Sequence, residues 1–365
     1  MLQLETKQDE IVRCILLVAA LICFSINCPA QSLVSQVDAY MIAATRESDF
    51  GATVLIARGG KVLVSRSYGM ANRELDVPNS PQTKFRIGSL TKQFTSMSVM
   101  ILQERGKLNV QDSVCKYVPD CPQAWADVTV HHLLTHTSGI PDLLRFPNFT
   151  ETMALPSPVA KTVERFRDKP LEFKPGKKWS YSNSGYILLG YIVERASGKS
   201  YEAVVRESIF VPLKMSNSGS DRHDLLIKSR ANGYAREGNS IVNARYIDMS
   251  LPTGGGSLYS TVEDMLLWDQ ALYTEKLVAQ KSLDAMFKPH MMTPFGDGSG
   301  YGWFIRRDKS NRRVIGHNGR INGFSCEVAR FPDERVFIVV FCNMNGVPVD
   351  KVVYDLAAIT FAASH

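Results

Sequence analysis

The chain has 365 residues, and its 42 lysines and arginines against 36 acidic residues give a formal net charge of +6. The basic residues are scattered and form no runs with interleaved aromatic residues, so we expect no nucleic-acid partner. The length exceeds the usual size of a single hydrophobic core and predicts one large two-lobed domain or two domains.

The first thirty residues have features of a signal peptide. An almost wholly apolar run, Ile15 to Ile26, precedes Pro29-Ala30-Gln31, which fits a cleavage site. A spanning helix needs about 20 apolar residues, so this run is too short for a membrane anchor. We therefore expect residues 1–30 to be removed, the mature protein to be secreted or periplasmic, and no integral membrane anchor to remain. Three acidic residues before the run depart from the positive charge that such leaders usually carry: Glu5, Asp9 and Glu10.

The first part of the mature chain reads as a helix, a hairpin and a second helix. Apolar residues at helical spacing predict an amphipathic first helix: Leu33, Val37, Met41 and Ala44. The β-rich runs Ala52 to Ala57 and Lys61 to Tyr68 are separated by a glycine turn and predict a hairpin. A short strand, Lys84 to Ile87, leads into a helix from Ser89 to Arg105 that stops at Gly106. This helix is apolar around most of its circumference and is expected to be buried.

The middle of the chain is predicted to be helical, and strands return near its end. We expect helices at Val130 to His136, Gly185 to Ala196, Tyr201 to Phe210 and Val262 to Ala271. Four strands and a closing helix follow: Tyr301 to Arg306, Arg312 to Gly316, Gly323 to Phe331, Arg335 to Cys342, and then Val349 to Ala362. Strands at both ends predict one sheet covered by the terminal helices, with a helical lobe inserted. We place the sheet lobe at 31–109 and 282–365 and the helical lobe at 110–281.

Four cysteines lie beyond the predicted signal peptide. Cys115 and Cys121 could form a disulfide in an oxidising compartment, and two free thiols are the alternative. Cys326 and Cys342 flank a predicted hairpin turn that aligns Cys326 with Phe341, so we expect this second pair to be reduced. Within the sequence, no C-x-x-C pair suggests zinc or redox chemistry.

Ser89 has the surroundings that a nucleophilic serine needs. Lys92 lies three residues further along the same helix and can point at the Ser89 hydroxyl. Burial lowers the pKa of a lysine and could make Lys92 a base, and the Ser89 N–H, in the first turn, can donate to an oxyanion. Ser89 as a helix N-cap remains an alternative. A second S-x-x-K, Ser113 to Lys116, begins no long apolar helix, and we interpret it as a coincidence in a loop.

Two further motifs follow in order. Tyr181-Ser182-Asn183 is the only Y-x-N of the chain, and His317-Asn318-Gly319 is the only H-x-G. A hairpin tip beside the strand Arg312 to Gly316 is one interpretation of the latter. With Ser89, these sites resemble the three-motif set of the superfamily of serine β-lactamases, D-alanyl-D-alanine peptidases and family VIII esterases. The resemblance spans roughly Val34 to Phe361 and includes Phe85 to Lys92, Leu133 to Pro141, Gly254 to Ser260 and Gly316 to Phe324.

The resemblance implies an α+β fold with a mostly antiparallel sheet and assigns a role to each motif. Ser89 would form the acyl-enzyme, and Lys92 and Tyr181 would share the proton transfers, with the identity of the base left open. Asn183 would orient Lys92 and bind a substrate amide. The backbone N–H groups of Ser89 and Arg320 would form the oxyanion hole. Substrate would also contact three residues of the third motif, which has a histidine where many β-lactamases have lysine: His317, Asn318 and Gly319.

The predicted function is hydrolysis of an ester or a D-amino-acid peptide amide through a serine acyl-enzyme. The alternatives are a β-lactamase and, from another class, a β-lactam- or peptidoglycan-binding sensor that stays acylated. The expected partners are a small-molecule ester, a β-lactam or a peptide, with cell-wall peptidoglycan as a further candidate. We expect no cofactor. We also expect no metal at His132 and His136, because no glutamate completes an H-E-x-x-H motif with them.

Overall fold

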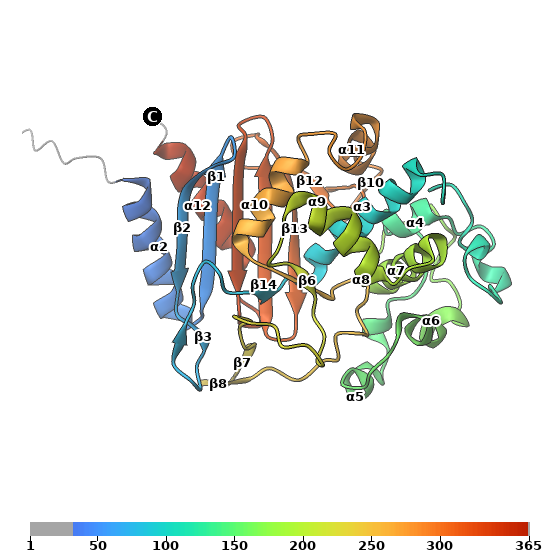
Figure 1. Ribbon diagram of the computed structural model, residues 1–365, viewed down its shortest axis with the longest axis horizontal. Helices are drawn as coiled ribbons and strands as arrows, with labels where there is room; N and C mark the ends of the chain where they lie inside the picture. The colour runs from blue at the N-terminus through green and yellow to red at the C-terminus, as the bar shows by residue number, and fades with distance from the viewer. Residues whose placement is uncertain (1–31, 364–365) are drawn as a thin grey trace, which may run out of the picture.

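An eight-stranded antiparallel sheet forms the centre of the computed structural model, which describes residues 32–363 (Figure 1). The strand order is β10-β11-β12-β13-β14-β15-β1-β2. The strands are β1 (Ala52–Arg58), β2 (Lys61–Tyr68), β10 (Met291–Met292), β11 (Gly298–Ser299), β12 (Phe304–Arg307), β13 (Arg313–Ile321), β14 (Phe324–Phe331) and β15 (Val336–Cys342). The β1–β2 hairpin joins the rest of the sheet through β15, which pairs with β1. The predicted α+β class with a mostly antiparallel sheet is confirmed.

Both faces of the central strands are covered, which explains their continuous apolar sequences. Along β15, Phe337, Val339 and Phe341 belong to one hydrophobic core, and the alternating residues Val336, Ile338, Val340 and Cys342 belong to the other. The helices α2 (Leu33–Ser48) and α12 (Val349–Ala362) pack on the second of these faces. A strand that is buried on both faces has no solvent side on which polar residues could alternate.

The helical part of the chain lies beyond the β13 side of the sheet, away from α2 (Figure 1). The helices between β2 and β10 are α3 (Thr91–Glu104), α4 (Val130–Leu134), α5 (Phe149–Thr152), α6 (Val159–Arg167), α7 (Asn183–Ser197), α8 (Tyr201–Val205), α9 (Val211–Leu213), α10 (Val262–Ala271) and α11 (Gln280–Phe287). Of these, α10 packs against β1 and β15 of the sheet. Short strands form three small sheets: β5 (Phe85–Arg86) with β9 (Leu258–Ser260) and β6 (Gly219–Ser220), β3 (Met70–Asn72) with β4 (Val77–Pro78), and β7 (Tyr234–Glu237) with β8 (Ser240–Asn243). Within residues 32–363, no helix is long and apolar enough to cross a membrane.

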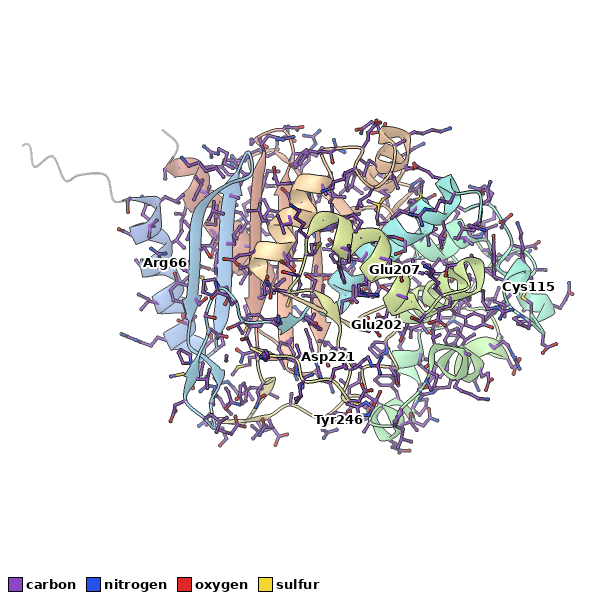
Figure 2. All side chains as sticks on the ribbon, in the orientation of Figure 1. Arg66, Cys115, Glu202, Glu207, Asp221 and Tyr246 are labelled. Carbon is purple, nitrogen blue, oxygen red and sulfur yellow. A yellow bond between two sulfur atoms is a disulfide. The ribbon has the colours of Figure 1, made fainter. Side chains whose placement is uncertain are left out.

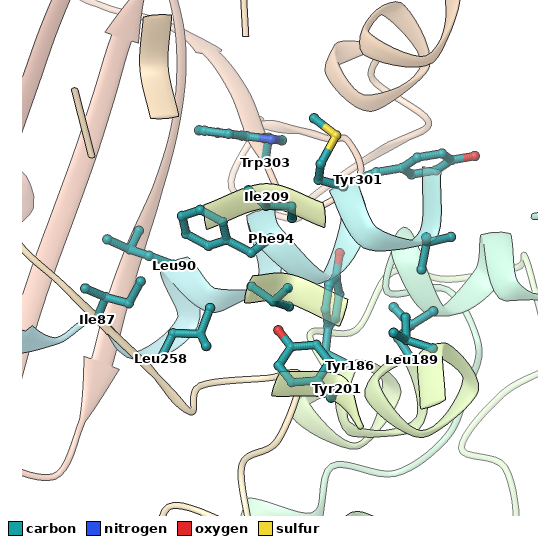
Figure 3. Close-up of a cluster of buried hydrophobic side chains, with 14 of the residues drawn as sticks. Ile87, Leu90, Phe94, Tyr186, Leu189, Tyr201, Ile209, Leu258, Tyr301 and Trp303 are labelled. Atoms are coloured by element: carbon teal, nitrogen blue, oxygen red, sulfur yellow. The ribbon is translucent and has the colours of Figure 1, made fainter. Parts of the chain in front are cut away.

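The helix that follows Ser89 is buried, as predicted. A 3-10 turn, η1 (Gly88–Leu90), precedes α3, and every residue from Thr91 to Leu102 is buried. Figure 3 shows Leu90 and Phe94 inside a core to which several distant segments contribute. The helix ends before Gly106, whose φ of +66° suits glycine. A buried helix of this kind gives its first turn a fixed position in the molecule.

Two local predictions were wrong. The strand predicted to end at Gly316 continues to Ile321, and the chain reverses at Gly323, which has a φ of +84°. His317 is therefore not at a hairpin tip, because β14 pairs with β13 along its length. The helix predicted to reach His136 ends at Leu134, and His136 adopts a φ of +58°. The helix predicted from Tyr201 to Phe210 is present, and its second half, Arg206–Phe210, is π-helical.

The structure decides between the alternatives for the cysteines. Cys115 and Cys121 form a disulfide in the helical part of the chain (Figure 2). Cys326 and Cys342 are buried and reduced, and Cys326 lies opposite Phe341 as predicted. The expected signal peptide, residues 1–30, lies outside the described residues.

The close contact between η1 and β13 gives a stability prediction. A Cβ atom at Gly319 would lie 2.0 Å from the backbone oxygen of Ile87, so Gly319→Ala must push the turn and the strand apart. We expect the free energy of unfolding to fall by about 1–3 kcal/mol, measured by urea denaturation. The control is Gly185→Ala, where the nearest atom would be 3.8 Å away. An equal loss in both variants would contradict this account of Gly319.

Candidate active site

Ser89 lies in the middle of η1, where the turn contacts β13. Gly88 has a φ of +49°, and a Cβ atom there would be 2.8 Å from the backbone nitrogen of Arg320. Glycine at positions 88 and 319 thus lets two backbones touch. Gly88 and Leu90 are buried, whereas Ser89 is only partly buried. The contact brings the backbone of Arg320 next to Ser89, as an oxyanion site formed by these two residues would need.

Lys92 points at Ser89 from the first turn of α3. Its Nζ lies 3.1 Å from the Ser89 Oγ, 3.0 Å from the Asn183 Oδ1 and 2.8 Å from the Gly255 carbonyl oxygen. Lys92 is completely buried, and this burial lowers the pKa of its amine to about 7, with the charge of Asp142 acting in the opposite direction. A substantial fraction of Lys92 can therefore be an uncharged amine at neutral pH.

Tyr181 approaches Ser89 from the loop before α7. Its hydroxyl is hydrogen-bonded to Ser89, and burial raises the pKa of the phenol well above its usual value. The Lys92 Nζ lies 4.9 Å from the centre of the Tyr181 ring. The His136 ring stacks on the Tyr181 ring, with 4.4 Å between the ring centres. The Nδ1 of His136 accepts a hydrogen bond from the Ser182 N–H at 3.2 Å. His136 therefore fixes the loop that carries Tyr181.

Asn183 is the first residue of α7 and donates two hydrogen bonds to Asp142. Asp142 Oδ1 accepts from the Asn183 backbone N–H at 3.2 Å, and Oδ2 accepts from the Asn183 Nδ2 at 3.1 Å. The Asn183 side chain thus joins Asp142 to Lys92. Sequence patterns assigned no site role to Asp142, His136 or Gly255. Asp142 directly follows the motif stretch that ends at Pro141, but a lone carboxylate in a sequence gives no sign of its partner.

The third motif lies within β13, where the strand has only one sheet neighbour. The pairing of β12 with β13 ends at Gly316, so the edge from His317 onward is free of β12. The His317 ring is buried, stacks on Phe304 at 4.8 Å and lies 6.2 Å from the Tyr181 ring. Burial, with the charge of Lys92, lowers the pKa of His317 to about 3, so this imidazole is neutral. Asn318 and Arg320 point to the exposed side of the strand.

The other candidates from the sequence do not form a comparable site. The Ser113 hydroxyl donates to the Ala126 carbonyl, and Lys116 forms an exposed ion pair with Asp112. The Nδ1 of His132 accepts from the Thr129 N–H. Among residues 32–363, no group of three or more histidine, cysteine, aspartate and glutamate side chains is arranged to hold a metal ion.

An apolar pocket of about 100 Å³ opens beside Ser89. Asn183 and Arg320 contribute to its wall next to the serine. Most of the remaining lining is hydrophobic and comes from four separate parts of the chain: Leu144, Phe149, Ile187, Ile247, Leu251, Pro252 and Ile321. A substrate group that enters this pocket would exchange water for apolar contacts.

The chain is similar to known proteins over most of its length. The family model described as Beta-lactamase matches residues 41–361. Penicillin-binding protein 4* of Bacillus subtilis (strain 168) is 30% identical over 315 residues, which cover 80% of this chain and 68% of that protein. The octameric penicillin-binding protein homologue from Pyrococcus abyssi has a TM-score of 0.81 at 30% identity, over 89% of this chain and 77% of that chain.

A third similarity is to the fold of a D-amino acid amidase from Ochrobactrum anthropi SV3. Its TM-score is 0.76 at 23% identity, over 90% of this chain and 99% of that chain. The family predicted from the three motifs is confirmed, since the match covers nearly all of the described residues. The chain belongs to the Beta-lactamase family and is a serine hydrolase of that superfamily.

Proposed function

We propose that the protein hydrolyses small esters or D-amino-acid peptide amides through an acyl-enzyme on Ser89. The observation that carries the proposal is the environment of the Lys92 amine. Two of its three polar neighbours, the Asn183 Oδ1 and the Gly255 carbonyl, can only accept hydrogen bonds. The two hydrogens of a neutral amine serve these acceptors. Its lone pair then faces the third neighbour, the Ser89 hydroxyl.

The proposed reaction begins with proton transfer from Ser89 to Lys92. We assign the base role to Lys92 because its pKa is lowered to about 7, whereas the pKa of Tyr181 is raised. The Ser89 Oγ attacks the substrate carbonyl, and the backbone N–H groups of Ser89 and Arg320 stabilise the oxyanion. The Tyr181 hydroxyl passes the proton from Lys92 to the leaving group. Water then hydrolyses the acyl-enzyme by the same proton transfers in reverse.

The pocket and His317 favour an ester or amide over a β-lactam. The apolar wall beside Ser89 suits an apolar group attached to the reacting carbonyl. His317 is a neutral imidazole where many β-lactamases have a lysine, so this position supplies no positive charge for a β-lactam carboxylate. We assign His317 and Gly319 to the substrate-binding edge of β13, together with Asn318. The fold of the D-amino acid amidase, which was solved with D-phenylalanine, supports the amide as substrate.

We also propose that the protein acts outside the cytoplasm, after removal of residues 1–30. The Cys115–Cys121 disulfide supports this location, because disulfides persist in oxidising compartments. Peptides of cell-wall peptidoglycan are candidate natural substrates there. The similarity to penicillin-binding protein 4* supports one alternative to hydrolysis: the protein is acylated by penicillin and stays acylated.

Replacement of the nucleophile gives the first functional prediction. Ser89→Ala should lower kcat/KM for p-nitrophenyl acetate by roughly 10³-fold or more and abolish the mass adduct formed with the ester or with penicillin. Ser113→Ala is the control and should behave like the wild type. Turnover retained by Ser89→Ala, or an adduct mapped to Ser113, would refute the assignment. A stable penicillin adduct without ester turnover in the wild type would support the binder instead.

The second prediction concerns pH. Lys92 must be uncharged to accept the Ser89 proton, and the amine loses its charge as the pH rises through its pKa of about 7. We expect kcat/KM for the ester to rise about tenfold per pH unit below this value and to level off above it. Rates between pH 5 and 9, corrected for spontaneous hydrolysis, provide the measurement. A profile that is flat down to pH 5 would rule out Lys92 as the base.

The third prediction tests the pocket. Leu144 is 45% exposed and lines the pocket, so Leu144→Asp should oppose entry of an apolar acyl group. The ratio of kcat/KM for p-nitrophenyl butyrate over p-nitrophenyl acetate should fall about 10-fold. Leu155→Asp changes a leucine of similar exposure, 59%, outside the pocket lining and should leave the ratio unchanged. The same fall in both variants, or in neither, would show that the acyl group lies elsewhere.

A further inference from the structure

Both carboxylate oxygens of Asp142 accept hydrogen bonds from Asn183. It is 7% exposed and precedes the 3-10 turn η4 (Leu143–Arg145), whose Leu144 N–H donates to its Oδ1 at 3.3 Å. The same Oδ1 accepts the Asn183 backbone N–H, and Oδ2 accepts the Asn183 side-chain amide. One carboxylate therefore holds both the backbone and the side chain of a residue that lies 41 positions further along the chain.

These contacts select one orientation of the Asn183 amide. A side-chain amide donates from its nitrogen and accepts at its oxygen, and its orientation is fixed by the groups on either side. A carboxylate can only accept, so Asp142 takes the Nδ2 hydrogens and leaves the Oδ1 facing Lys92. In the reverse orientation, the amide would present a donor to Lys92 and compete with the Ser89 hydroxyl for the lone pair of the neutral amine.

We infer that Asp142 is a positioning residue, which holds the Asn183 amide so that the Lys92 lone pair is directed at the Ser89 hydroxyl. This role rests on the proposed function, in which Lys92 is the base. Asp142 has no part in the covalent steps. Its effect on the reaction passes entirely through Asn183 and Lys92.

The charge of Asp142 reaches Lys92 as well. The titratable side chains that face Lys92 come from the loop between α4 and η4, from the loop before α7, from α7 itself and from β13: His136, Asp142, Tyr181, Tyr186 and His317. The pKa values of the two histidines are lowered and those of the two tyrosines are raised, so these four are uncharged near neutral pH. Asp142 raises the pKa of Lys92 against the effect of burial.

The test is the pH profile of Asp142→Asn. The new side chain keeps an oxygen that can accept from Leu144 and Asn183, so η4 retains its cap. It loses the charge and can accept or donate where Asp142 only accepts. We expect kcat/KM for p-nitrophenyl acetate to fall about 10- to 100-fold and the acid limb to move to lower pH, because the pKa of Lys92 falls when the charge is removed. Asp142→Ser, which keeps a capping oxygen, should move the limb in the same direction.

Asp264→Asn is the matched control. Asp264 is also buried, at 3% exposure, and its Oδ2 accepts from the Asn217 N–H and the Ser218 hydroxyl, away from Lys92. General damage from loss of a buried carboxylate would lower the rate without moving the acid limb. Asp264→Asn should therefore leave the limb in place. An unmoved limb in Asp142→Asn, with kcat/KM within twofold of the wild type, would overturn the inference while leaving the proposed function intact.

A second measurement does not depend on turnover. Carbon-13 lysine NMR can follow the titration of Lys92, with its signal assigned by comparison with Lys92→Arg. The titration should shift to lower pH in Asp142→Asn. If the wild type shows no Ser89-dependent ester turnover, the proposed function fails. The inference about Asp142 fails separately if the Lys92 titration is the same in the wild type and in Asp142→Asn.

Discussion

A completely buried lysine amine fixes the geometry of the whole site. An amine that is buried must find its hydrogen-bond partners within the protein, because each unsatisfied group costs free energy. The partners of Lys92 come from the turn η1, from the start of α7 and from the loop before β9. These three segments lie far apart in the chain. The need to satisfy one nitrogen therefore ties their positions together, and the burial that demands these contacts also lowers the pKa of the amine.

The second constraint is the close approach of two backbones. Gly88 and Gly319 have no side chain to separate η1 from β13, and both positions would clash with the opposite backbone if they carried one. The reacting serine and the Arg320 N–H are thus placed by main-chain contact, which depends little on side-chain rotamers. At Gly319 the backbone oxygen of Ile87 occupies the place that a Cβ atom would need, so this glycine allows the close contact between the two segments.

The sequence predicted those parts of the site whose residues occur in recognisable order. Ser89, Lys92, Tyr181 and His317 belong to motifs, and the buried helix behind Ser89 follows from its apolar residues. Asp142, His136 and Gly255 could not be predicted, because their roles exist only after distant segments meet. The end of β13 was misjudged for a similar reason, since pairing with β14 carries the strand past an Asn-Gly sequence that favours a turn. The lobe boundaries at residues 110 and 281 stay a prediction.

The pairing of β1 with β15 has a consequence for how the chain folds. Residues 52–58 pair with residues 336–342, so β1 gains its partner β15 only after the helical part of the chain and the strands β10 to β14 have been synthesised. At about 5–20 residues per second, the wait is on the order of tens of seconds. During this wait, β1 is an exposed apolar edge of the β1–β2 hairpin. Its unsatisfied backbone groups readily pair with other chains. Closure of the sheet is thus a late step, and protection of this early hairpin against aggregation becomes a condition for reaching the native state.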